Sequence, residues 1–174
     1  MILASALYRI IPDRPLGFAP QMAIAIFAGS LLVSNKKLAF LLPLISMLVS
    51  DGLYQLLYLN GLSTIPGFYH GQWVNYILFI SLTCFGFFVR TKNILSIATA
   101  SFAAPTAFFL ASNFMVWVGG GGLHRPKTIT GLMQCFADGL PFYQGSLMAT
   151  GIFAAVLFGT YSLFTNAAPS KSIA

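Results

Sequence analysis

The sequence predicts an all-α fold, a polytopic bundle of five to six transmembrane helices that forms a single integral membrane domain over residues 1–174. Of the 174 residues, 57% are hydrophobic and 7% are charged, whereas a soluble domain carries about 25% charged residues. Residues 94–118 form a run of 25 without an ionisable side chain, and a bilayer core about 30 Å thick needs roughly 20 apolar residues as helix. So few charges cannot cover a water-exposed surface, which excludes a soluble domain.

Five apolar segments are expected to cross the bilayer, and prolines or glycines mark special positions in three of them. Pro20 suits the first turn of the first segment because its missing donor costs nothing there, and Pro105 predicts a kink in the fourth. Gly139 and Pro141 are expected to break the last segment into a short helix and a full span. A sixth span is expected from residues 1–11 or 129–140. The five segments cover residues 19–35, 38–59, 72–89, 93–118 and 129–164.

The formal charge of +6 arises from nine Lys and Arg against three Asp. Because the cations lie in short connections between apolar segments, they indicate membrane topology rather than nucleic-acid binding. With five spans, one side carries five of the cations and the other side four. We expect the first set in the cytoplasm: Lys36, Lys37, Arg90, Lys92 and Lys171 against Arg9, Arg14, Arg125 and Lys127.

Asp51 is the polar residue with the strongest functional implication, because it lies inside the second apolar segment. An aspartate at the centre of a membrane helix costs about 2.5–3.5 kcal/mol on insertion scales. It therefore faces a polar cavity or a partner, or else it lies near the headgroups as a helix-end or capping residue. The first alternative makes Asp51 a contact for a substrate or an ion.

Four further residues are candidates for lining a binding site. Asp138 is expected at the break in the last segment, where free backbone groups suit a site, although a loop position is the alternative. Asn113 and Trp117 are four residues apart and share a helix face, which suits a flat organic ligand. The alternative for this pair is an interfacial aromatic and a helix–helix hydrogen bond. Arg125 is expected to attract an anionic ligand at the mouth, and Arg9 is expected to do so from the N-terminal side.

Other patterns give weaker indications. Ala25 and Gly29 form a small-xxx-small face, which serves either internal packing or docking to another membrane subunit. Cys84 and Cys135 have no metal-ligand spacing with the two histidines, so no metal and no cofactor are expected. The sequence contains no nucleophile elbow, paired carboxylates or nucleotide-binding loop. It therefore predicts a protein that is not an enzyme.

Several strings resemble the motifs of a family of small bacterial integral membrane proteins of unknown function. They are Tyr8-Arg9-Ile10-Ile11-Pro12, Phe18-Ala19-Pro20, Pro43-Leu44 with Ser50-Asp51, the segment 112–117, Pro126-Lys127-Thr128, the segment 131–136 and Leu140-Pro141-Phe142. That family is similar in layout to the substrate-binding S components of energy-coupling-factor (ECF) vitamin transporters. The resemblance implies a multi-pass protein of the bacterial inner membrane, which docks a transmembrane coupling subunit that works with ATPases.

The function expected from these observations is that of a membrane-embedded component for binding and uptake of a small, vitamin-like micronutrient. Asp51, Asn113, Trp117, Asp138 and Arg125 are its predicted lining residues, and Ala25 and Gly29 its predicted docking face. The alternative is a structural or accessory subunit of a larger membrane complex with no ligand of its own. Expected partners are a small-molecule ligand, membrane lipids and a coupling subunit, and not nucleic acid.

Overall fold

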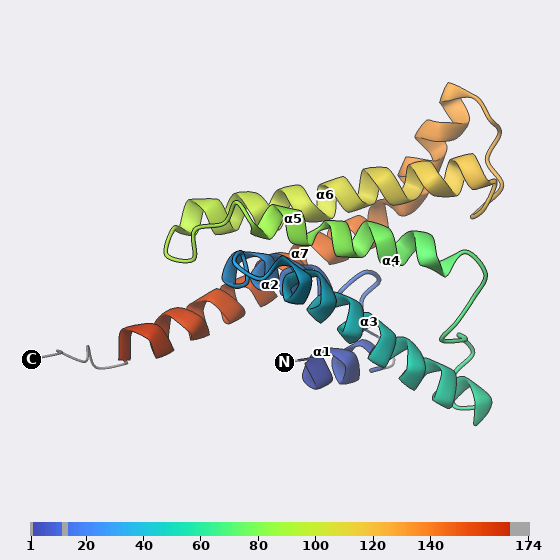
Figure 1. Ribbon diagram of the computed structural model, residues 1–174. Coiled ribbons are helices and arrows are strands. Elements are labelled where there is room, and N and C mark those ends of the chain that lie inside the picture. Colours follow the sequence, from blue (N-terminus) through green and yellow to red (C-terminus); the bar gives the residue numbers. More distant parts are fainter. Residues whose placement is uncertain (1, 12–13, 168–174) are drawn as a thin grey trace, which may run out of the picture.

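The computed structural model describes residues 2–11 and 14–167, and within them it contains seven helices and no strand (Figure 1). The all-α class predicted from the composition is therefore confirmed. The helices are α1 (Ile2–Arg9), α2 (Gln21–Leu31), α3 (Lys36–Leu59), α4 (Gln72–Ser81), α5 (Thr83–Gly86), α6 (Ile94–Gly119) and α7 (Ile129–Ala167).

The short helix α2 is the centre of the bundle. It contacts α3, α4, α5, α6 and α7, and every residue from Gln21 to Gly29 is buried. A helix that is apolar on all sides is expected in such a position. Its Phe27 packs edge-on against Phe158 of α7 with ring centroids 5.0 Å apart, and Ile26 is fully buried.

Three helices are long and apolar enough to cross a membrane, namely α3, α6 and α7. They coincide with the second, fourth and fifth predicted segments. Asparagines begin two of them: the side chain of Asn35 accepts from the Leu38 amide at 3.2 Å, and that of Asn93 accepts from the Ser96 amide at 3.1 Å. These contacts satisfy backbone donors that have no partner inside the helix. The outer faces carry exposed apolar side chains such as Leu110 and Val156, as lipid contact requires.

The first and third predicted segments form shorter helices. The 11 residues of α2 extend about 17 Å at 1.5 Å per residue, less than the bilayer core. The third segment is divided at Leu82 into α4 and α5. Around Leu82 the backbone bonds join residues three apart, as from the Leu82 amide to the Phe79 carbonyl at 3.1 Å, and this tighter winding separates the two helices.

The predicted break in the last segment is wrong, because α7 is one helix of 39 residues that contains Pro141. A proline removes a single backbone donor, and α7 keeps its contacts with α6 on both sides of it. On one side Gly139 packs against Asn113, and on the other the Tyr143 hydroxyl lies 2.9 Å from that of Thr106. Asp138 consequently lies within a continuous helix.

The two connections that flank α6 lie at opposite ends of the bundle (Figure 1). Lys92 precedes α6 and Lys127 follows it. Lys36 lies at the Lys92 end, since its ammonium group is 5.9 Å from the centre of the Phe87 ring. For Lys36, Lys92 and Lys127 this arrangement agrees with the predicted separation of the cations, whereas Arg9 lies beside the buried Asp51. Lys171 lies outside the described residues.

Candidate binding site

Asp51 is buried in the interior of α3, with only 2% of its side chain exposed. Three side chains donate to its carboxylate. The Arg9 guanidinium binds Oδ1 in an ion pair, whereas the Gln72 amide and the Tyr76 hydroxyl each bind Oδ2 at 2.6 Å. Because eight residues of α3 follow it, Asp51 is neither a cap nor a helix-end residue.

Three helices bring these groups together. Arg9 is the last residue of α1, which packs beside α3. Gln72 and Tyr76 are one turn apart on α4, so they share the face that meets α3. The left-handed backbone of Gly71, with φ +80°, precedes Gln72 and begins α4. In the sequence, Arg9, Gln72 and Tyr76 lie 42, 21 and 25 positions from Asp51. Only the packing of the three helices brings them to its carboxylate.

The connection from α3 to α4 folds back over the carboxylate at Gly67. A β-carbon there would clash with the carbonyl oxygen of Asp51 and would lie 2.9 Å from the Gln55 side chain. The Gly67 amide donates to Gln55 Oε1 at 3.1 Å, and its carbonyl accepts from Gln72 Nε2 at 3.0 Å. Glycine is therefore needed for the close approach of this loop to α3.

A second set of contacts fixes Arg9. Its Nη1 also donates to the Ser50 hydroxyl at 2.6 Å, and its guanidinium lies 5.7 Å from the centre of the Tyr54 ring. The Arg9 carbonyl accepts from the Tyr54 hydroxyl at 2.6 Å and from Arg14 Nε at 2.9 Å. Arg14 also donates to the Phe18 carbonyl at 2.9 Å. Both arginines are thus used to hold the segment between α1 and α2.

The charge of Asp51 is balanced within the protein. Both carboxylate oxygens already have partners, and a buried charge is tolerated only when it is paired and hydrogen-bonded. By contrast, within residues 2–11 and 14–167 the Arg9 guanidinium donates hydrogen bonds through Nη1 only, and 25% of its side chain is exposed. Asp51 therefore positions Arg9, whose side chain lies at the wall of a cavity.

Two cavities adjoin at the centre of the bundle. One has a volume of about 420 Å³ and the other of about 260 Å³, and both are lined by Arg9 and Met47 together with three phenylalanines, Phe79, Phe108 and Phe142. Small-molecule sites occupy about 300–1,000 Å³ and combine apolar walls with a few polar groups. The larger cavity is bounded further by Asp51, Tyr69, Gln72, Asn75, Tyr76, Ser112, Asn113, Val116 and Gly139.

Polar atoms reach both cavities. Gln21, at the start of α2, lines the smaller one. It is 2% exposed, and its Oε1 has no hydrogen-bond partner among the described residues. Asn113 of α6 lines the larger one and donates to the Phe109 carbonyl at 2.8 Å. A β-carbon on Gly139 would lie 2.5 Å from Asn113 Oδ1. Gly139 therefore provides the space that the asparagine side chain occupies.

The structure places two of the five predicted lining residues, Asp51 and Asn113, at one cavity. The other three are absent from the lining of both central cavities and join the 120–128 connection to α6 and α7. Trp117 donates to the Pro126 carbonyl at 2.9 Å. Arg125 forms a two-bond ion pair with Asp138, both bonds being 2.8 Å, and these bonds raise the pKa of the guanidinium.

The small-residue face predicted for docking is inside the protein. Ala25 is fully buried, and Gly29 lies against α5, where a β-carbon on it would be 2.9 Å from Gly86 Cα. The close approach that this face permits is therefore used by α2 and α5. Cys84 is an exposed thiol and Cys135 a buried one that lies 3.4 Å from the Asn113 carbonyl. No group of three metal-ligating side chains occurs among residues 2–11 and 14–167.

Sequence reasoning did not identify Gln21, Gln72 and Tyr76 as site residues, and it assigned Arg9 only to the attraction of an anion. A usable signal existed for two of them. Gln72 and Tyr76 are spaced by four at the start of an apolar segment, which gives that helix one polar face. Gln21 carried no such signal, because a glutamine after Pro20 also suits an exposed first turn.

Comparison with known proteins assigns the chain to a family. The family described as "Family of unknown function (DUF6580)" has a model that matches residues 1–171. No curated protein and no solved structure matches the chain.

Proposed function

We propose that this chain, which belongs to the DUF6580 family, is a membrane-embedded component that binds a small micronutrient and takes part in its uptake. In this proposal it is a multi-pass protein of the bacterial inner membrane, in the manner of an ECF S component. The shorter helices α2 and α4–α5 complete a layout of five to six membrane segments together with α3, α6 and α7. The uptake step requires an energy source outside the chain, supplied by a coupling subunit and its ATPases.

The observation that carries the proposal is the pair of adjoining central cavities, which contain a buried acceptor without a partner. Buried polar groups nearly always have a hydrogen-bond partner, so Gln21 Oε1 calls for a donor from a ligand. A purely structural subunit has no need of an internal cavity lined by paired charges.

The walls define the chemistry of the ligand. Arg9 and Asp51 neutralise each other, so the site favours a ligand that is neutral or carries a single negative charge toward Arg9. Phe79, Phe108 and Phe142 offer ring surfaces to a flat or apolar part. Gln21 Oε1 accepts and the remaining Arg9 N–H groups donate. A heterocycle with an amide- or ureide-like edge, in the size range of a vitamin, meets these requirements.

A thermal-shift screen of the purified protein against water-soluble vitamins tests the proposal. A ligand present at 100 times its Kd stabilises the folded state by about 2.7 kcal/mol. Gln21→Leu removes the acceptor at nearly constant volume and should reduce the shift, whereas Gln134→Leu, on the exposed surface of α7, should preserve it. If no compound shifts the transition and mass spectrometry finds no small molecule in gently purified protein, the accessory-subunit alternative is favoured instead.

A further inference from the structure

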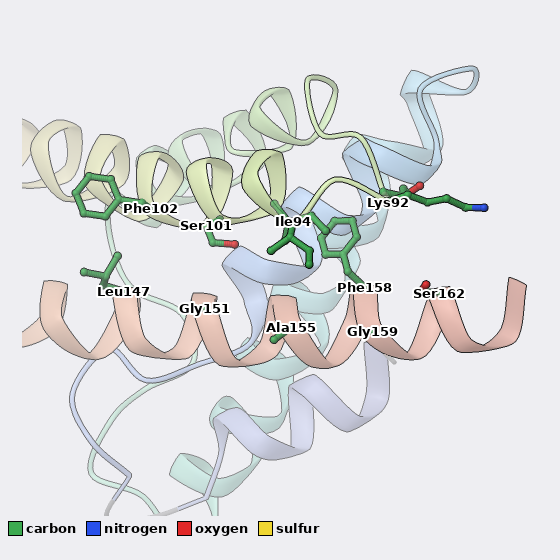
Figure 2. Close-up of a pocket in the computed structure, with 13 residues that line it drawn as sticks. Lys92, Ile94, Ser101, Phe102, Leu147, Gly151, Ala155, Phe158, Gly159 and Ser162 are labelled. Carbon is green, nitrogen blue, oxygen red and sulfur yellow. The ribbon is translucent and has the colours of Figure 1, made fainter. Parts of the chain in front are cut away.

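A long groove between α6 and α7 is separate from the central cavities. Its volume is about 800 Å³, and none of its lining residues belongs to either central cavity. Figure 2 shows that it runs between the two helices, with Phe102 and Leu147 near one end and Lys92 near the other. No sequence pattern predicts this groove, because its residues come from two segments about 50 positions apart.

Small residues of α7 keep the groove open. Gly151, Ala155 and Gly159 follow one another at intervals of four, so they lie on one face of the helix and line its floor. A β-carbon added to Gly151 or Gly159 would meet no atom within 4 Å. The floor is therefore free space, whereas the Gly29–Gly86 crossing is already filled by a neighbouring helix.

The hydroxyl of Ser101 indicates that an occupant with a polar atom belongs in the groove. Ser101 lines it (Figure 2), is 6% exposed, and its Oγ has no hydrogen-bond partner within the part of the chain that the structure describes. Other hydroxyls of α6 bond to their own helix: Thr99 donates to the Leu95 carbonyl at 2.9 Å and Thr106 to that of Phe102 at 2.7 Å. Since buried hydroxyls are normally paired, Ser101 lacks the partner that a ligand can supply.

The Lys92 end of the groove is cationic. Lys92 is exposed and forms no ion pair within the described part of the chain. Lys36 lies at the same end, over the Phe87 ring, and Arg90 is in the connection that carries Lys92. Both described aspartates are paired elsewhere. Basic sites at the ends of membrane helices attract anionic lipid headgroups.

We propose that this groove binds an anionic glycerolipid. The phosphate lies at Lys92, one acyl chain follows the glycine floor of α7, and an ester carbonyl accepts from Ser101. Ester groups lie between the phosphate and the chains of a glycerolipid, which is the order in which the groove presents Lys92, Ser101 and apolar wall. A second copy of the chain fits less well, because it inserts in the same orientation and brings its own cationic end to Lys92.

Native mass spectrometry of the full chain tests this proposal with two lipids that share acyl chains, dioleoyl phosphatidylglycerol and dioleoyl phosphatidylcholine. We expect one phosphatidylglycerol to be retained at least fivefold more than phosphatidylcholine. Lys92→Gln should remove most of that preference, and Lys37→Gln, which alters an exposed cation outside the groove, should keep it.

A pair of volume variants locates the lipid. Ala155→Phe fills the groove and should lower lipid retention at least fivefold, whereas Val156→Phe, on the adjacent exposed face of α7, should retain lipid normally. Equal retention of both lipids with no effect of Lys92→Gln overturns the proposal. So does a dimer that Ala155→Phe converts to a monomer, because the occupant is then another copy. Vitamin-induced thermal shifts are independent of these outcomes, since the central cavities share no residue with the groove.

Discussion

Arg9 and Asp51 form an ion pair that joins the end of α1 to the interior of α3. The carboxylate is almost fully buried, and its other oxygen is bound by Gln72 and Tyr76 of α4. One acidic side chain thereby connects three helices beside the central cavity. Removing Arg9 leaves a buried carboxylate without its opposite charge, and removing Asp51 leaves the partly buried guanidinium without its own.

Asp51→Ala is therefore expected to lower the free energy of unfolding by about 3 kcal/mol, as breaking a buried pair typically does. Unfolding in detergent micelles, followed by circular dichroism, measures the effect. The double variant Arg9→Met, Asp51→Leu should recover part of the loss, because it removes both charges and keeps their volume. Equal or greater loss in the double variant would contradict a charge-pairing role for Arg9.

The crossing of α2 and α5 leads to a second prediction. Gly86→Ala should destabilise the protein by about 1–3 kcal/mol, the usual cost of overpacking, because its β-carbon would meet the Ile26 carbonyl and lie 2.8 Å from Gly29 Cα. Gly151→Ala is the matched control. It adds the same methyl group to a helical site with open space and should leave stability unchanged or raise it by about 0.5–1 kcal/mol. Thermal unfolding of both variants measures this difference in stability. Equal melting temperatures would contradict the tight crossing of α2 and α5.

The helical class and three long membrane helices could be predicted because charge depletion over about 20 residues has few other causes. Predictions failed where tertiary contacts set the outcome. Pro141 was expected to end a helix, yet contacts between α6 and α7 continue past it. The short length of α2 could not be predicted either, because the sequence of an apolar helix at the centre of a bundle resembles that of a helix that crosses lipid.

At the site, a single rule found Asp51: a charge inside an apolar segment needs a partner or a cavity. The partners themselves could not be derived, because Arg9 and Tyr76 reach Asp51 through the packing of α1 and α4 on α3. Asp138 was selected on a different ground, the helix break expected beside it, and it pairs with Arg125 at a partly exposed position of α7. Burial, which the sequence does not encode residue by residue, separates these two aspartates.

Binding measurements distinguish the two groups of predicted site residues. With a ligand identified by thermal shift, Asn113→Ala should weaken binding about tenfold, the equivalent of about 1.4 kcal/mol and within the range of one lost hydrogen bond. Arg125→Met should change the Kd less than twofold, because its pair with Asp138 lies outside the central cavities. Isothermal titration gives both values. A large effect of Arg125→Met together with none of Asn113→Ala would move the site to the 120–128 connection.

The two ends of α6 are predicted to lie on opposite sides of the membrane. A variant without the native thiols, Cys84→Ser and Cys135→Ser, accepts a single new cysteine at Lys92 or at Leu123, both of which are exposed. Because α6 is long and apolar enough to cross the bilayer, an impermeant maleimide added to intact cells should label Leu123→Cys and spare Lys92→Cys, which the positive-inside rule places in the cytoplasm. Labelling in permeabilised cells shows that both thiols are reactive. If intact cells label both positions, α6 does not span the membrane, and if they label only Lys92→Cys, the orientation is the reverse of the one inferred from the cations.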